Sequence, residues 1–305
     1  CVTACLACGM TVESRPPNDG WATASTSGAL SPEEVATYRK QGFLAITDFA
    51  SAEEMTNMRA RAEKIVDEFE YDRASVFSTT DQKRTTDDYF LDSANGISCF
   101  FEEKAHDERG NLCVPKALAI NKIGHALHDY DDVFRAFSRS EKVANLMKSL
   151  ELPNPTPVQS MYIFKQPSIG GEVVPHQDST FLNTEPPTCV GIWLALEDCT
   201  LDNGCLHAVP GTPPVTRIMS VDHDSSERSI EFIGEATAVD LSRASPLCVP
   251  AGTLILLHGA NVHFSRANTS PHSRHAYSVH FVDGRARWRD TNWLRRAPSR
   301  PFQPL

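Results

Sequence analysis

The sequence lacks a long apolar run and an excess of positive charge. A transmembrane helix needs about 20 consecutive apolar residues, and the 305-residue sequence has no such run. It has 29 Lys and Arg residues against 39 Asp and Glu residues, a formal net charge of −10, which gives no general attraction for a phosphate backbone. We therefore expect neither a membrane protein nor a nucleic-acid-binding protein, but a globular protein that acts on a small molecule.

The cysteines lack the even number and regular spacing of a disulfide framework. Nine of them are scattered from Cys1 to Cys248, in a chain large enough to build a core without disulfides. This predicts free thiols and an intracellular, cytoplasmic protein. The C-terminal tripeptide is not a peroxisomal signal, and N-terminal targeting stays open because the numbering starts at Cys1. Cys5 and Cys8 form a CxxC pair without a second pair nearby, so its role also stays open.

Two helix starts stand out in the first part of the chain. Ser31 and Ser51 are each followed three residues later by Glu, which is a capping box, and Gly42 is typical of a helix end. Residues 1–30 are expected to form a disordered or linker-like tail. Residues 31–150 are expected to be a helical buttress, with helices over about 31–40, about 51–69 and, with gaps, about 121–150.

The pattern changes near residue 157, where short β-rich runs alternate with Gly, Pro and Asn. The runs cover residues 159–166, 190–196, 247–249, 253–257 and 276–282. Such spacing is typical of a barrel or jelly roll. The predicted fold is mainly β with flanking helices, a single domain over residues 31–305 whose barrel spans about 157–283.

His176 and Asp178 carry the sharpest chemical signal. They are one residue apart in an extended segment, so both side chains are expected on one face. With His263 they form the two-histidine, one-carboxylate set that binds Fe(II) in non-haem oxygenases and leaves positions open for a 2-oxo acid and O₂. Arg274 can hold the distal carboxylate of 2-oxoglutarate with two parallel hydrogen bonds, and Ser265 can add a hydroxyl donor.

Longer stretches of the sequence resemble the phytanoyl-CoA dioxygenase family. The matching segments are residues 120–128, 159–167, 170–178, 203–206 with Pro210 and Gly211, and 258–277. The resemblance implies a double-stranded β-helix (jelly-roll, cupin-like barrel) that uses Fe(II), 2-oxoglutarate and O₂. It implies that His176, Asp178 and His263 bind the metal. It further implies that the co-substrate is bound by Arg274, Ser265, Lys122, Met161, Gln177 and Trp193.

His258 is the rival for the third metal position. It follows an apolar strand directly, but it has no Ser two residues later, and the family pattern selects His263. We expect His258 to be a packing residue.

Three functions are compatible with these residues. The leading hypothesis is a dioxygenase that converts 2-oxoglutarate to succinate and CO₂ while hydroxylating an unidentified substrate, which can be lipid-like or acyl-CoA-like. A non-catalytic module that binds metal and 2-oxoglutarate would keep the same residues. A zinc-dependent hydrolase could use the same His and Asp ligands, but it gives Arg274 no evident role.

Two further segments, one before the β-rich region and one at the C-terminus, suggest roles in binding the substrate or a partner. Residues 71–115, with Phe100 and Phe101, are expected to form a loop over the site, where substrate selection would lie. Six arginines near the C-terminus, Arg285, Arg287, Arg289, Arg295, Arg296 and Arg300, are expected to lie in a solvated extension, with a patch for an anionic substrate or partner as the alternative. The sequence does not set the oligomeric state.

Overall fold

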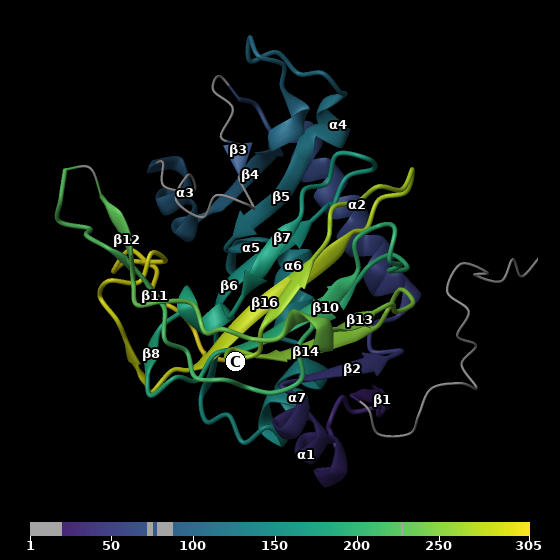
Figure 1. Cartoon of the computed structure of the whole chain (residues 1–305), viewed down its shortest axis with the longest axis vertical. Helices are drawn as coiled ribbons and strands as arrows, with labels where there is room; N and C mark the ends of the chain where they lie inside the picture. Colours follow the sequence, from purple (N-terminus) through teal and green to yellow (C-terminus); the bar gives the residue numbers. More distant parts are fainter. Residues whose placement is uncertain (1–19, 72–75, 78–87, 227) are drawn as a thin grey trace, which may run out of the picture.

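Two β-sheets packed face to face form the centre of the molecule (Figure 1). The computed structural model describes residues 20–71, 76–77, 88–226 and 228–305. The large sheet has the order β1 (Trp21–Thr23), β2 (Phe43–Thr47), β14 (Leu254–His258), β9 (Val190–Ala195), β16 (Ala276–Asp283), β6 (Pro155–Ile163), β5 (Ile120–His125), β4 (Ile97–Glu102) and β3 (Val76–Phe77). The small sheet has the order β13 (Ser245–Leu247), β10 (Leu206–Ala208), β15 (His263–Ser265) and β7 (Val173–His176).

Two short two-stranded sheets and the helices complete the described chain. One sheet pairs β11 (Ile218–Val221) with β12 (Ile230–Ile233), and the other pairs β8 (Thr184–Glu185) with β17 (Arg287–Trp288). The α-helices are α1 (Pro32–Gln41), α2 (Ala52–Glu68), α3 (Asp88–Asp92), α4 (Lys116–Ala119), α5 (Leu127–Tyr130), α6 (Asp132–Ser138) and α7 (Glu141–Ser149). Short 3₁₀ helices lie at η2 (Ser93–Asn95), η3 (Glu103–Ala105), η4 (Asp178–Thr180) and η5 (Leu241–Arg243).

Alternation of side chains along the strands of the large sheet gives it two different faces. In β2, Leu44 and Ile46 pack with buried residues of α1, α2, α6 and α7, whereas Phe43 and Ala45 pack with residues of the small sheet. Neighbouring strands of the sheet divide in the same way, since successive strand residues point to opposite faces. The helices therefore cover one face, and the other face closes against the small sheet as a double-stranded β-helix, as predicted.

Both predicted capping boxes are present. Ser31 and Ser51 each accept a hydrogen bond from the backbone of a glutamate three residues on, and the two glutamates bond back to the serine amides. Gly42 ends α1 with φ = 77°, a left-handed conformation that favours glycine. The sequence therefore located these two helices correctly.

The boundary of the predicted helical buttress is wrong in two places. Residues 21–23 form β1, paired in parallel with β2, so the chain joins the sheet before residue 31. Residues 120–125 form β5, hydrogen-bonded to β4 and β6, not helix. The apolar residues Ile120, Ile123 and Leu127 have helical spacing, but β5 is buried along its whole length, and such a strand has no alternating pattern to reveal it.

The predicted loop over the site is also partly wrong. Phe100 and Phe101 are fully buried in β4 and belong to the sheet. Residues 88–105 of the predicted loop contain α3, η2, β4 and η3, so much of this segment is regular structure. Residues 72–75 and 78–87 of that prediction lie outside the described residues, as does the Cys5 and Cys8 pair. The six cysteines within the described ranges have free thiols.

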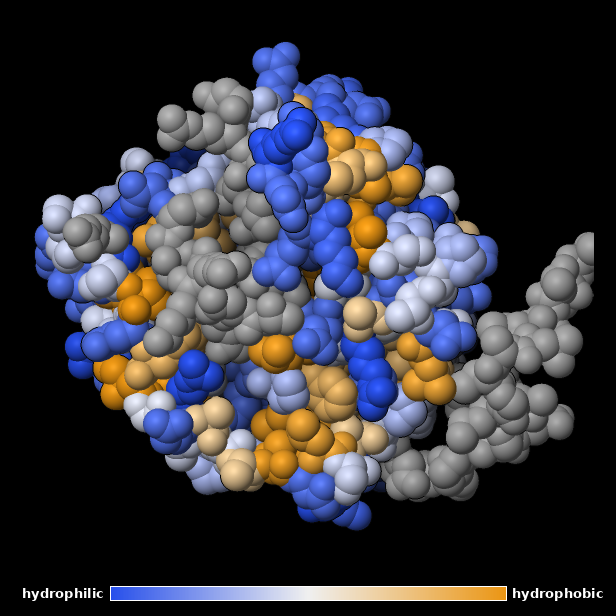
Figure 2. All heavy atoms as spheres, turned by 45° about the horizontal axis from the view of Figure 1, so that its top comes forward, coloured by the Kyte–Doolittle hydropathy of each residue, from blue (hydrophilic) through white to orange (hydrophobic). Residues whose placement is uncertain are grey.

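The surface mixes polar and apolar side chains. On the face shown in Figure 2, hydrophobic residues form small groups separated by polar ones. Among the described residues, no helix has the length and apolar character needed to cross a membrane.

Four of the six C-terminal arginines form ion pairs within the protein, so the segment is not simply a solvated extension. Arg285 pairs with Asp283, Arg287 and Arg289 with Glu185, and Arg296 with Asp129. These four charges are offset within the chain, and the alternative of an anion-binding patch stays a prediction.

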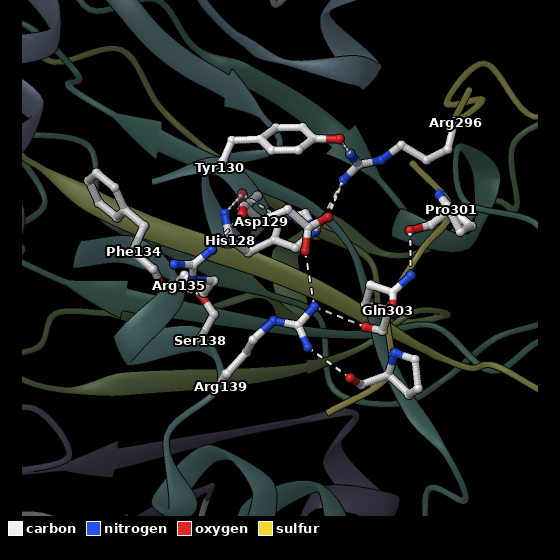
Figure 3. Close-up of polar contacts among 12 residues, drawn as sticks. His128, Asp129, Tyr130, Phe134, Arg135, Ser138, Arg139, Arg296, Pro301 and Gln303 are labelled. Atoms are coloured by element: carbon white, nitrogen blue, oxygen red, sulfur yellow. Dashed lines mark hydrogen bonds and ion pairs between the residues drawn. The ribbon is translucent and has the colours of Figure 1, made fainter. Parts of the chain in front are cut away.

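Asp129 is the centre of the strongest of these contacts (Figure 3). It receives hydrogen bonds from Arg296, at 2.6 Å, and from Arg139, at 3.0 Å, and Arg139 also donates to the carbonyls of Gln303 and Pro304. Burial alone would raise the pKa of Asp129, but His128 and the two arginines lower it to about 2. The carboxylate therefore fastens the C-terminal segment to α5 and α6.

We expect Asp129→Asn to lower the free energy of unfolding by about 3 kcal/mol, because it leaves two partly buried guanidinium groups without a counter-charge. The matched control is Asp132→Asn, an exposed residue paired only with Arg135, which should change it by less than about 0.5 kcal/mol. Urea unfolding measures the free energy of unfolding of both variants. Equal losses in Asp129→Asn and Asp132→Asn would contradict the structural role given to Asp129.

The same contact predicts a pH dependence. Because the folded-state pKa lies below the usual 3.8, the stabilisation is fully present above about pH 4 and is lost as the pH falls towards 2. The difference in free energy of unfolding between wild type and Asp129→Asn should therefore decrease as the pH is lowered from about 4 to 2.

Candidate metal centre and co-substrate pocket

Pairing of β7 with β15 brings the two predicted metal-binding histidines together. His176 and His263 are direct partners across these antiparallel strands, with ring centroids 4.3 Å apart. Asp178 opens the 3₁₀ turn η4 that follows β7, and its Oδ1 lies 3.6 Å from Nε2 of each histidine. One candidate ligand atom from each of the three residues lies within 4.8 Å of the others, which is a spacing that one metal ion can bridge.

Backbone carbonyls orient both histidine rings. His176 Nδ1 lies 2.9 Å from the carbonyl oxygen of Val174, and His263 Nδ1 lies 3.3 Å from that of Asn261. A carbonyl can only accept, so each Nδ1 carries a proton, and each Nε2 faces Asp178 and is the nitrogen left for a metal ion. Metal-binding histidines are usually held in this way. The donor set fits Fe(II) in a two-histidine, one-carboxylate centre.

His280 is a third histidine at the centre, one that the sequence analysis missed. Its Nε2 lies 3.3 Å from Oδ2 of Asp178. Burial would raise the pKa of Asp178, but His263, His280 and His176 lower it well below its usual value. Asp178 is therefore ionised at neutral pH. Alternation along β16 from Arg274 is the sequence signal that could have identified His280.

A cavity of about 220 Å³ extends from this centre to Arg274. The Arg274 side chain is fully buried, and its guanidinium lies 4.9 Å from the centre of the Trp193 ring. Among the described residues, its Nε and Nη1 have no hydrogen-bond partner. Burial lowers the pKa of Arg274, but an arginine stays charged. A buried cation with free donors calls for an anionic ligand, and the distal carboxylate of 2-oxoglutarate fits it.

Ser265 lies beside a second buried cation that the sequence analysis did not identify. Lys165 Nζ donates to Ser265 Oγ, at 2.9 Å, and to the carbonyl of Gly171, at 2.6 Å. Since Lys165 has donated to the serine oxygen, the serine proton is left to point elsewhere, towards the cavity that both residues line. Burial and the charge of Arg274 lower the pKa of Lys165 to about 7.

Three other predicted pocket residues also line the cavity: Lys122, Met161 and Trp193. Lys122 is buried between the rings of Phe90 and Phe100, at 5.9 and 5.5 Å from their centres, and its Nζ contacts Met161 Sδ at 3.9 Å. Burial lowers the pKa of Lys122 well below its usual value.

Two residues lie outside this cavity. Gln177 points away from it, because its neighbours His176 and Asp178 point inward, and its amide donates to the carbonyls of Pro213 and Ala260. The expectation that the Gln177 side chain binds the co-substrate is therefore not supported. His258 accepts a hydrogen bond from the Ala260 amide and packs near Tyr38, so its place is that of a packing residue.

Comparison with known proteins agrees with this geometry. Residues 38–276 match the family model described as phytanoyl-CoA dioxygenase (PhyH). A "phytanoyl-CoA dioxygenase" of Arabidopsis thaliana is 44% identical over 275 residues, covering 89% of this chain and 95% of the relative. "Phytanoyl-CoA dioxygenase domain-containing protein 1" of Mus musculus is 44% identical over 286 residues, covering 90% and 98%.

Solved structures share the fold at much lower identity. EctD from S. alaskensis, crystallised with 2-oxoglutarate and 5-hydroxyectoine, superposes with a TM-score of 0.60 at 16% identity, covering 90% of this chain and 91% of that one. The family match and the similar full-length relatives together settle the relationship. The chain belongs to the phytanoyl-CoA dioxygenase family.

Proposed function

We propose that this dioxygenase uses Fe(II), 2-oxoglutarate and O₂ to hydroxylate a C–H bond in a largely apolar substrate. One oxygen atom of O₂ enters succinate as 2-oxoglutarate loses CO₂, and the other becomes the hydroxyl of the product. The observation that carries the proposal is the buried guanidinium of Arg274, whose Nε and Nη1 have no hydrogen-bond partner among the described residues and which lies in the same cavity as the His176, Asp178 and His263 cluster. A hydrolase or a purely structural metal site has no use for such a group.

Different residues of the cavity bind the metal, bind the co-substrate and exclude water. Bound iron would supply the activation of O₂ at the three ligands. Arg274 holds the distal carboxylate of 2-oxoglutarate, and Ser265, whose oxygen accepts from Lys165, directs its proton towards the same carboxylate. Trp193 packs on Arg274 and excludes water from this ion pair, which strengthens it because the local dielectric constant is low.

The substrate end of the cavity is apolar. Phe90, Leu182, Met219 and Trp293 line it and belong to one hydrophobic cluster. The names of the relatives refer to phytanoyl-CoA, a fatty acyl thioester. Both observations support a lipid-like substrate, of which an apolar portion enters the cavity.

We expect His263→Ala to reduce iron-dependent formation of succinate from 2-oxoglutarate by at least about 10³-fold, because it removes one of three metal ligands. The matched control is His258→Gln, which should keep turnover within about twofold of wild type. Succinate is measured in air with added Fe(II), with and without candidate lipids. Absence of sustained turnover in wild type would favour a non-catalytic binding module.

We expect Arg274→Met to weaken binding of 2-oxoglutarate by about 100-fold, since a buried bidentate ion pair contributes two charge-assisted hydrogen bonds. Arg289→Met, which removes a partly exposed arginine paired with Glu185, is the control and should leave binding unchanged. Calorimetric titration of the zinc-loaded proteins separates binding from catalysis. Equal affinities in wild type and Arg274→Met would refute the role given to Arg274.

A further inference from the structure

His125 lies at the apolar end of the cavity and has no role in the chemistry described above. Its ring is fully buried among Phe90, Phe100 and Trp293, whose centres lie 5.4, 5.4 and 5.0 Å away. Phe90 and Trp293 also stack on each other at 4.4 Å. This packing fixes the plane of the imidazole, so its two nitrogens have defined directions.

A chain of hydrogen bonds determines which nitrogen carries the proton. Ser93 Oγ contacts both the carbonyl of Phe90 and Nδ1 of His125, the latter at 2.7 Å. The serine has one proton, and the carbonyl can only accept. Both contacts are satisfied when Ser93 donates to Phe90 and His125 Nδ1–H donates to Ser93. His125 Nε2 is then an unprotonated acceptor.

His125 Nε2 has no hydrogen-bond partner among the described residues, and the residue lines the cavity. Burial, together with the nearby Lys122 and His280, lowers the pKa of His125 well below its usual value, so the ring is neutral at physiological pH. His280 in turn contacts the metal ligand Asp178. His125 therefore lines the same cavity as the metal-binding residues, among its apolar side chains.

We propose that His125 Nε2 binds a hydroxyl or N–H group of the primary substrate, and that the substrate is an apolar molecule bearing such a donor. This inference rests on the proposed function, whose substrate class it narrows. A ligand that leaves this buried acceptor unpaired binds less tightly. The cavity should therefore favour ligands that carry an O–H or N–H donor over ligands that lack one. A thioester or ether oxygen can only accept, and a carboxylate would face the lone pair of His125 with a negative charge.

The discrimination is tested with matched probes on protein loaded with Zn(II) and 2-oxoglutarate. The probes are cyclohexanol, 1-octanol and 4-tert-butylphenol, each compared with its methyl ether by calorimetric titration. In wild type, at least one alcohol should bind about tenfold or more tightly than its ether. If no alcohol binds more tightly than its ether, the inference is overturned.

The variant that removes the acceptor is His125→Phe, which keeps an aromatic ring in the aromatic cage. It should bring the preference for alcohol over ether to within about twofold, mainly by weakening alcohol binding. His272→Phe changes an exposed histidine and should retain the wild-type preference. An unchanged preference for alcohol over ether in His125→Phe would show that another group accepts the hydrogen bond from the alcohol, and would refute the role given to His125.

The tautomer gives a readout that does not depend on any ligand. Nitrogen NMR of histidine-labelled wild type should show an unprotonated, pyridine-type Nε2 for His125, a signal that His125→Phe identifies by its loss. Ser93→Ala should move this signal towards the average of the two tautomers. A protonated Nε2 in wild type would overturn the inference.

The binding arm uses zinc and does not require turnover. A chain that forms succinate with iron but shows no alcohol preference refutes only the role of His125. A chain that prefers alcohols but forms no succinate refutes the proposed function and leaves the binding site in place.

Discussion

The antiparallel pairing of β7 with β15 is the constraint on which the site depends. It places His263 opposite His176, although the two residues are far apart in sequence, and η4 then turns Asp178 back towards both. Neither strand is long, and each is held in place by the sheet packing behind it. The helices on the far face of the large sheet thus contribute to the metal centre indirectly, by keeping the two sheets in register.

The sequence predicted the parts of this arrangement that local chemistry determines. Capping residues gave the ends of α1 and α2, and the spacing of His176 and Asp178, with Arg274 after His263, pointed to a metal and a 2-oxo acid. Binding of a 2-oxo acid requires Arg274 and Ser265 to line one cavity, and they do. The Nε and Nη1 groups of Arg274, which have no hydrogen-bond partner among the described residues, would be costly to bury without such a ligand.

Two omissions concern buried polar residues. Lys165 and His125 are polar side chains of a kind that is usually exposed, yet both are buried beside the cavity. The strand β5 was predicted as helix for a different reason: its apolar residues have helical spacing, and a strand buried along its whole length has no alternating pattern to reveal it. Gln177 failed in the opposite sense: the strand alternation that turns His176 and Asp178 inward turns the residue between them outward.

Polarity changes along the cavity in an order that matches the proposed reaction. The Arg274 end carries buried cations and suits a dicarboxylate, and the centre carries the anionic Asp178 among three histidines. The far end is mainly aromatic and aliphatic, with His125 as an acceptor and Lys122 buried between Phe90 and Phe100. A charged co-substrate and an apolar substrate are therefore directed to opposite ends by desolvation alone, since each would lose favourable contacts at the other end. That sorting leaves the metal position between them, where both must meet the oxidant.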